Sequence, residues 1–171
     1  MTESAFWISV LFIIYPHLVF PALLYVLPGK KTGNLGKGAA GPVAVVCSVY
    51  NEEKVIARKI ENFYGIDYPE LELYLGLDGC TDNTFEAIRR AIRDDRVKVF
   101  AFPRGGKVSV LNALLEKVNQ PYVVMTDANS MFRTDAVTRL MEHMRDGVGV
   151  VCGRLVLVDE EGHSGEGIYW R

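Results

Sequence analysis

The sequence predicts an α/β domain with a mostly parallel sheet, preceded by one apolar helix. From Pro42 onward, short runs rich in β-branched residues alternate with segments whose apolar residues recur at helical spacing, the pattern of strands covered by helices. Before that point, residues 5–27 carry no formal charge. The length of 171 residues suits one folded core with an appendage. We therefore expect a transmembrane helix at 1–28, a flexible linker at 29–41 and a domain at 42–171.

The N-terminal segment is long enough to cross a membrane, since roughly 23 residues at about 1.5 Å of rise give about 34 Å. Pro16, His17 and Pro21 interrupt it, so a kinked, tilted or partly re-entrant helix is an alternative, and so is a buried helix of a soluble protein. Glu3, together with the lack of Lys or Arg ahead of the apolar run, disfavours a cleaved signal peptide.

Positive charge follows the apolar helix rather than preceding it. Lys30, Lys31 and Lys37 lie shortly after its end, and basic residues mark the cytoplasmic side of membrane helices. We expect a single-pass protein of the cell membrane with residues 29–171 in the cytoplasm.

Strands and helices alternate through the predicted domain. Val43 to Val49 is a nearly continuous β-branched run, as expected for a strand buried on both faces. Asn51 is a candidate cap for the helix that follows, and Asp82 is a candidate cap for the next one. The other predicted strands are 71–77, 97–102, 122–126 and 149–158, and the later predicted helices are 82–92, 107–118 and 135–144.

Composition excludes some classes of function. The formal net charge is −2 and the basic residues are dispersed, so there is no electrostatic footprint for a nucleic acid. Cys47, Cys80 and Cys152 are far apart and lack CxxC spacing, which disfavours both a disulfide framework and a zinc site.

Three side chains with functional chemistry directly follow predicted strands, namely Tyr50, Asp78 and Asp127. Ligands bind beyond the carboxyl ends of the strands in open parallel sheets, so these residues should meet at one edge of a Rossmann-like sheet. A tyrosine ring at this place can stack on a nucleobase, although a core-edge tyrosine is the alternative. Asp78 can accept hydrogen bonds from a base or a ribose; the alternative is a turn-forming Asp-Gly.

Other residues add a cation site and an anion site. Asp127 and Asn129 offer the hard oxygen ligands that Mg²⁺ or Mn²⁺ prefers, with a helix-entry turn as the alternative. Lys107 follows two glycines at a helix start, a suitable place for a diphosphate, unless it is simply a solvated lysine. Glu53 either interacts favourably with the helix dipole at the start of the next helix or contacts the ribose side of a nucleotide.

In this order and spacing, the motifs resemble the family 2 glycosyltransferases of the GT-A fold, especially membrane-attached polysaccharide and glycolipid synthases. The resemblance extends from about Pro42 to Arg171 and therefore covers an incomplete GT-A sheet. Its carriers are Val46-Cys47-Ser48-Val49-Tyr50-Asn51-Glu52-Glu53, Asp67-Tyr68-Pro69, Asp78-Gly79-Cys80-Thr81-Asp82-Asn83-Thr84, Gly105-Gly106-Lys107 with Leu111-Asn112, and Thr126-Asp127-Ala128-Asn129.

The resemblance implies transfer of a sugar from a nucleoside diphosphate donor, expected to be a UDP-sugar, to a hydroxyl acceptor on a glycan or lipid. It implies inversion at the sugar and Mg²⁺ or Mn²⁺ as cofactor. It also implies uracil stacking for Tyr50, nucleotide binding for Asp78, and metal binding for Asp127, with Asn129 in the second position of the family's DxD element.

The family's general base is expected downstream of residues 166–171, and Glu166 fits the acceptor loop better than the role of base. We therefore expect this chain to be the amino-terminal, donor-binding part of a larger enzyme, inactive or nearly so by itself. One alternative is a membrane-tethered nucleotide-binding or assembly module without catalysis. A nucleotidyltransferase of the pyrophosphorylase type fits less well, because it would need a Gly-rich basic loop where residues 50–53 stand.

Overall fold

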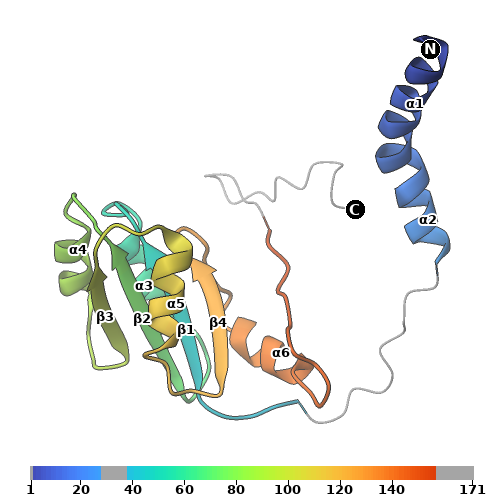
Figure 1. Cartoon of the computed structure of the whole chain (residues 1–171). Coiled ribbons are helices and arrows are strands. Elements are labelled where there is room, and N and C mark those ends of the chain that lie inside the picture. Colours follow the sequence, from blue (N-terminus) through green and yellow to red (C-terminus); the bar gives the residue numbers. More distant parts are fainter. Residues whose placement is uncertain (1, 28–37, 157–171) are drawn as a thin grey trace. The chain divides into compact units, whose positions relative to one another are not determined.

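The computed structural model describes residues 2–27 and 38–156 and confirms the predicted α/β fold. The chain divides into two compact units, residues 1–35 and 36–171. Within its described residues, the second unit holds four parallel strands in the order β3-β2-β1-β4 (Figure 1). In chain order its elements are β1 Val43–Val49, α3 Ile56–Tyr64, β2 Leu71–Asp78, α4 Thr84–Ala91, β3 Val97–Phe102, α5 Lys107–Leu115, β4 Tyr122–Asp127 and α6 Ala136–His143.

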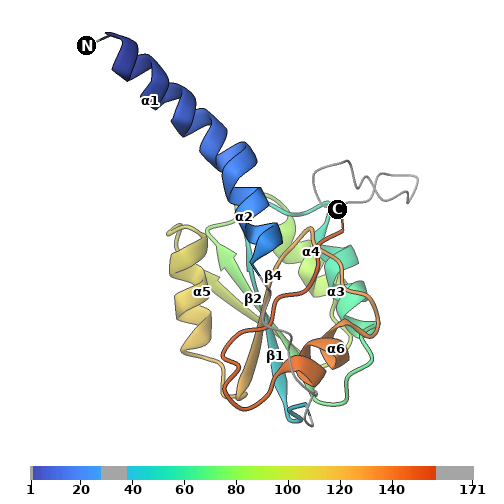
Figure 2. The ribbon, with the colours of Figure 1, turned by 90° about the vertical axis from the view of Figure 1, so that its right-hand side faces the viewer.

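β1 is the central strand of this sheet and is buried along almost its whole length. Because side chains of a strand alternate between its faces, β1 contributes to two separate cores. Val43 and Val45 pack in the larger core with residues of α3, α4 and α6, whereas Ala44 and Val46 pack with α5. Figure 2 shows α5 on one face of the sheet and α3, α4 and α6 on the opposite face.

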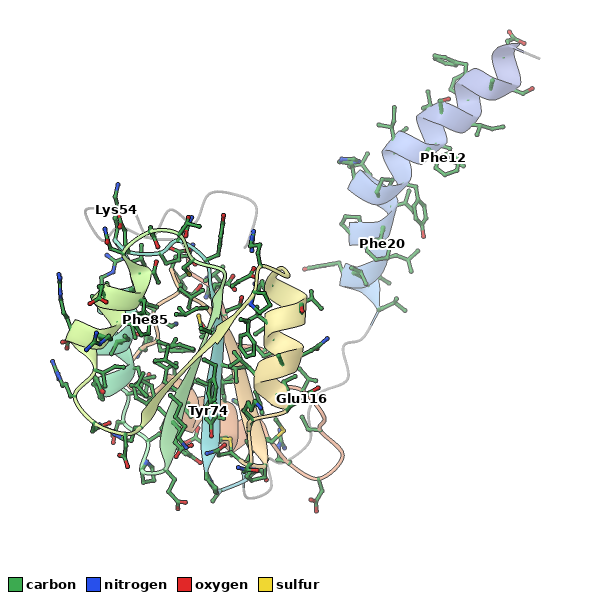
Figure 3. All side chains as sticks on the ribbon, turned by 60° about the vertical axis from the view of Figure 1, so that its left-hand side comes forward. Phe12, Phe20, Lys54, Tyr74, Phe85 and Glu116 are labelled. Carbon is green, nitrogen blue, oxygen red and sulfur yellow. The ribbon has the colours of Figure 1, made fainter. Side chains whose placement is uncertain are left out.

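α5 packs closely on β2 because residue 76 is a glycine. A Cβ atom at Gly76 would lie 2.4 Å from Cγ1 of Val110 and 2.9 Å from Cδ1 of Leu114. Overpacking of this kind costs about 1–3 kcal/mol. Tyr74, labelled in Figure 3, fills the same layer and is buried. This contact holds the start of α5, at Lys107, near the edge where the strands end.

The first unit is a helical segment made of α1 (Thr2–Ile14), a π-helical turn η1 (Tyr15–Val19) and α2 (Phe20–Val26). Within the described residues, one stretch, Glu3–Val26, is long and apolar enough to cross a membrane, with 24 residues and a mean hydropathy of 2.0. Phe12 and Phe20 project outward from it (Figure 3).

The predicted interruption of this segment takes the form of the wide turn η1. Pro16 lacks a backbone N–H and cannot make the normal helical bond, and π-helical turns commonly absorb such defects. At the end of the turn, the N–H of Phe20 donates to the carbonyl of Tyr15.

The prediction of a fifth strand at 149–158 is wrong for residues 149–156, which form no strand; residues 157 and 158 lie outside the described part. Val150 is 78% exposed. β-Propensity measures how well a residue fits a pleated, half-buried surface, and this apolar run, broken by Gly149 and Gly153, has no such surface against it in the described chain.

Two further local predictions need correction. Asn51 does not cap a helix: it has a positive φ of 52°, and α3 begins only at Ile56, after Val55. Residues 38–41, assigned to the flexible linker by composition, lie against the domain. The N–H of Ala39 donates to the carbonyl of Met144 at 2.7 Å, which ties this stretch to the end of α6.

Candidate functional site

The carboxyl ends of β1, β2 and β4 meet at one edge of the sheet. The parallel register pairs Val49, the last residue of β1, with Leu77 of β2, directly before Asp78, and pairs Ser48 of β1 with Asp127 of β4. Tyr50, Asp78 and Asp127 therefore lie at a common edge, as the sequence predicts. Lys54, labelled in Figure 3, stands at the same end of the domain.

Asp78 is almost completely buried at this edge, with 1% of its surface exposed. Its carboxylate accepts hydrogen bonds from the N–H of Gly105 at 2.7 Å and from the N–H of Gly106 at 3.1 Å. It also forms an ion pair with Arg104. These donors, Gly105 foremost, hold the pKa of Asp78 below its ordinary value although burial raises it. The ionised carboxylate thus ties the loop before α5 to the end of β2.

Gly79 permits this close approach of the two loops. Its φ is +60°, and a Cβ atom would lie 2.9 Å from both the backbone nitrogen and the Cβ of Arg104. Its own N–H donates to the carbonyl of Phe102 at 2.9 Å. A residue with a side chain would strain the turn and push the arginine loop away.

Arg104 is the site residue that the sequence analysis missed. Its guanidinium carbon lies 3.6 Å from the centroid of the Tyr50 ring, while the same group pairs with Asp78. A planar guanidinium can stack on an aromatic face and pair with a carboxylate at the same time. The available signal was an arginine directly before Gly105-Gly106-Lys107. Tyr50 stays 43% exposed, so it remains open to a ligand.

Lys107 and Asp127 form the second ion pair of the edge. The ammonium of Lys107 donates to Oδ1 of Asp127, and the two side chains are 58% and 55% exposed. After Asp127 the chain makes a turn, in which the N–H of Ser130 donates to the Asp127 carbonyl at 3.3 Å. Asn129 is exposed in this turn.

The oxygen donors of Asp127 and Asn129 fit a divalent cation that takes its other ligands from phosphate and water. Mg²⁺ typically uses one or two carboxylates together with substrate phosphates, and Asp127 is accessible and already attracts a cation. Across residues 2–27 and 38–156, no group of three or more His, Cys, Asp or Glu side chains is placed to hold a metal ion. The described residues therefore suit a cation that is bound partly by the protein and partly by phosphate and water, rather than one bound by protein ligands alone.

The loops after β1 and β2 hold each other. The N–H of Thr81 donates to Oδ1 of Asn51 at 2.9 Å, and Nδ2 of Asn51 donates to Oγ1 of Thr81 at 3.1 Å. The carboxylate of Glu53 accepts from the backbone N–H and the side chain of Asn83, at 3.1 and 3.2 Å. Glu53 thus has a structural partner at the start of α4, and its predicted ribose contact stays a prediction.

Asp82 completes this loop pair. Its Oδ1 accepts from the N–H of Thr84 at 3.1 Å, which confirms it as a partner for the first amide of α4, although Asn83 occupies the cap position. Its Oδ2 accepts from the N–H of Glu53 at 3.2 Å. Asp82 therefore has a local role at the helix start.

A line of contacts follows this edge. The Tyr50 ring contacts Arg104, Arg104 pairs with Asp78, and Asp78 accepts from the N–H of Gly106. The next residue in the chain, Lys107, pairs with Asp127. The edge offers an open aromatic ring, two cations and an accessible carboxylate. These groups can stack on a base, pair with phosphates and bind a divalent cation.

The parallel sheet, together with its likeness to a solved mannosyltransferase structure, places the domain in the GT-A class of α/β folds. The model of the family described as "Glycosyl transferase family 2" matches residues 44–169. The chain belongs to this family.

Curated relatives agree with this assignment. The chain is 28% identical over 125 residues to an uncharacterized glycosyltransferase of Haemophilus influenzae, covering 71% of this chain and 50% of the relative. It is 25% identical over 114 residues to the poly-β-1,6-N-acetyl-D-glucosamine synthase of Staphylococcus epidermidis, covering 65% and 28%. The chain thus spans about half the length of the first relative and less of the second.

Solved structures share the fold. A mannosyltransferase from Pyrobaculum calidifontis, in complex with GDP-Man and Mn²⁺, superimposes with a TM-score of 0.59 at 28% identity, over 67% of this chain and 36% of that one. S. aureus TarS in complex with UDP-GlcNAc gives a TM-score of 0.54 at 22% identity, over 57% and 29%. The second likeness shows the fold alone.

Proposed function

We propose that this domain binds a nucleoside diphosphate sugar, with UDP as the nucleotide, and serves transfer of the sugar to a hydroxyl acceptor in polysaccharide or glycolipid synthesis. The carrying observation is the unbroken line of contacts from Tyr50 to Asp127 at one edge of the sheet. Membership of family 2 supports a transferase, and the name of the staphylococcal synthase supports a polysaccharide product.

The base and ribose are assigned to one end of this line. Tyr50 stacks on the uracil, with the guanidinium of Arg104 fixing the position of its ring. Asp78 holds Arg104 and the glycine loop in place and is the proposed nucleotide-binding acid. Glu53 is the proposed contact on the ribose side.

The diphosphate is assigned to the other end. Lys107 and Asp127 are each more than half exposed, so exchanging this surface ion pair for other partners costs little. Lys107, at the start of α5, then pairs with the diphosphate, where the helix dipole also favours negative charge. Asp127 and Asn129 would hold Mg²⁺ or Mn²⁺, which when bound stabilises the charge of the leaving diphosphate.

The proposed reaction is an inverting displacement. The acceptor hydroxyl attacks the anomeric carbon, the bond from that carbon to the diphosphate oxygen breaks, and a carboxylate base takes the hydroxyl proton. Glu166, which the family resemblance assigns to the acceptor loop as an expectation, lies outside the described residues.

We also propose that the helix predicted at 1–28 anchors the protein in the cell membrane, with residues 29–171 in the cytoplasm. The 24-residue apolar stretch supports a single span. Lys30, Lys31 and Lys37 support the orientation.

Calorimetry on the full chain in mild detergent tests the nucleotide assignment. UDP and GDP are titrated with and without Mn²⁺ against the native chain, Tyr50→Ala and Tyr50→Phe. We expect UDP to bind more tightly than GDP, and Tyr50→Ala to weaken UDP binding roughly tenfold, since one stacked base contributes about 1–3 kcal/mol. Tyr50→Phe, which keeps the ring, should stay close to the native value. A native chain that binds neither nucleotide would sink the proposal.

A further inference from the structure

Lys59 of α3 lies inside the domain, with 1% of its surface exposed. Its ammonium donates to Oγ1 of Thr126 at 2.9 Å and to the carbonyl of Ser130. Thr126 immediately precedes Asp127, and Ser130 immediately follows Asn129. One buried cation therefore joins the two ends of the turn that carries both proposed metal ligands.

Asn62, one turn further along α3, holds the chain that leaves this turn. Its Nδ2 donates to the carbonyl of Phe132 at 2.7 Å, and the N–H of Phe132 donates back to its Oδ1 at 2.7 Å. The Phe132 ring centroid lies 4.5 Å from the ammonium of Lys59. Side chains of α3 thus form hydrogen bonds with this segment at residues 126, 130 and 132.

A lysine at this position is costly for the fold. Lysine is almost never fully buried unless it is paired, and burial lowers the pKa of Lys59 to about 8. An apolar residue of similar length would fill the same space without that cost. Both hydrogen bonds of the ammonium go to Thr126 and Ser130. The lysine therefore differs from an apolar residue mainly in holding the turn between these two residues.

We propose that Lys59 is a positioning residue for the cation site, which fixes the backbone on both sides of Asp127 and Asn129 so that their oxygens face one ion. The inference rests on the proposed function, because it assumes that this turn binds a divalent cation together with UDP. Groups that orient metal ligands from behind typically change metal affinity about 10- to 100-fold when they are removed.

The test compares Lys59→Met with the native chain in detergent, using Mn²⁺ and UDP as probes. Methionine keeps most of the side-chain volume and removes both hydrogen bonds. We expect the paramagnetic resonance signal of bound Mn²⁺ to require roughly tenfold more Mn²⁺. We expect UDP binding measured without metal to stay within about twofold, because the stacking residues are not in contact with Lys59.

Two reference variants separate positioning from a general loss of stability. Ile88→Val trims a buried residue of α4 and should lower stability without changing Mn²⁺ affinity. Asp127→Asn removes the negative charge of the proposed ligand. If Asp127→Asn loses Mn²⁺ binding while Lys59→Met keeps the native value, the positioning role is overturned and the proposed function stands. If the native chain binds no UDP, both fall together.

Thr126→Val keeps the test decisive if Lys59→Met does not fold. This change removes the acceptor from the turn side, with little change in volume, and leaves Lys59 with the Ser130 carbonyl. We expect a smaller loss of Mn²⁺ affinity in the same direction, roughly threefold. An unchanged affinity in this variant overturns the proposal.

Discussion

Asp78 and Asp127 occupy equivalent places in the sequence, since each ends an apolar parallel strand, yet the fold uses them differently. Asp78 is 1% exposed and fully engaged by residues 104–106. Asp127 is 55% exposed, and among the described residues its carboxylate pairs with the exposed ammonium of Lys107. The buried acid organises the loop that carries the cations, whereas the exposed acid is free to change partners. An acid at a strand end therefore does not by itself indicate contact with a ligand.

The largest effect is expected from Asp78→Asn. The amide of asparagine keeps one accepting oxygen for Gly105 and Gly106 but turns an N–H group toward Arg104. The buried position therefore loses its charge and its ion pair with Arg104. We expect UDP affinity in Mn²⁺ to fall roughly 100-fold, together with a clear drop in the thermal midpoint measured by circular dichroism. Asp95→Asn, at an exposed position, is the matched control. Native UDP affinity in Asp78→Asn would break the comparison.

Acid pH provides a second measurement on the same variant. The pKa of Asp78 is lower in the folded chain than in the unfolded one, so its stabilising effect is fully present above the unfolded value, about 3.9. That stabilisation is lost as the pH falls through the folded pKa. The stability difference between the native chain and Asp78→Asn should therefore shrink on acidification below about pH 4. A constant difference would contradict an ionised, hydrogen-bonded Asp78.

Asp127→Asn should separate binding from stability. We expect the Mn²⁺-dependent gain in UDP affinity to fall roughly 30-fold, since Asp127 is the charged member of the proposed pair of protein ligands, Asp127 and Asn129. The free energy of unfolding should change by no more than about 0.5 kcal/mol, as for other exposed positions. Calorimetry and thermal melts measure the two quantities. A melting loss as large as that of Asp78→Asn would show that the two acids are equivalent after all.

The smallest effect is expected from Glu53→Gln. This variant tests whether Glu53 contacts the nucleotide or only the neighbouring loop. Glutamine can still accept from Asn83 at the start of α4, so the loop contact survives. We expect UDP affinity to change by less than about threefold in calorimetry. A loss near tenfold would instead favour the ribose-side contact that the sequence predicts.

Local patterns predicted much of this fold. The β-branched run identified β1 at its observed bounds, because a strand buried on both faces leaves a continuous apolar signal. β3 was also predicted at its observed bounds, although it is a partly exposed edge strand. The run beginning at Gly149 carried a similar signal and failed, because pairing depends on a neighbouring surface that propensity does not describe. The ends of the strands were therefore more predictable than their number.

Residues whose roles depend on distant partners were not predictable. Arg104 acquires its role from the bend at Gly79 and from the buried carboxylate of Asp78, neither of which is visible locally. Lys59 lies between Ile56 and Ile60 on the buried face of a helix, where a lysine looks like an exception to the apolar pattern. Only the fold shows that the turn after β4 lies above it.

The hydrogen bonds between residues 51–53 and residues 81–84 have a consequence for the dynamics of the domain. Each loop supplies hydrogen bonds that the other needs, so neither can open alone without breaking several of them. The beginnings of α3 and α4 should therefore fluctuate as one cooperative unit, with their amides exchanging with solvent at similar rates. If the proposed function holds, these two loops would respond to a bound nucleotide together rather than one at a time.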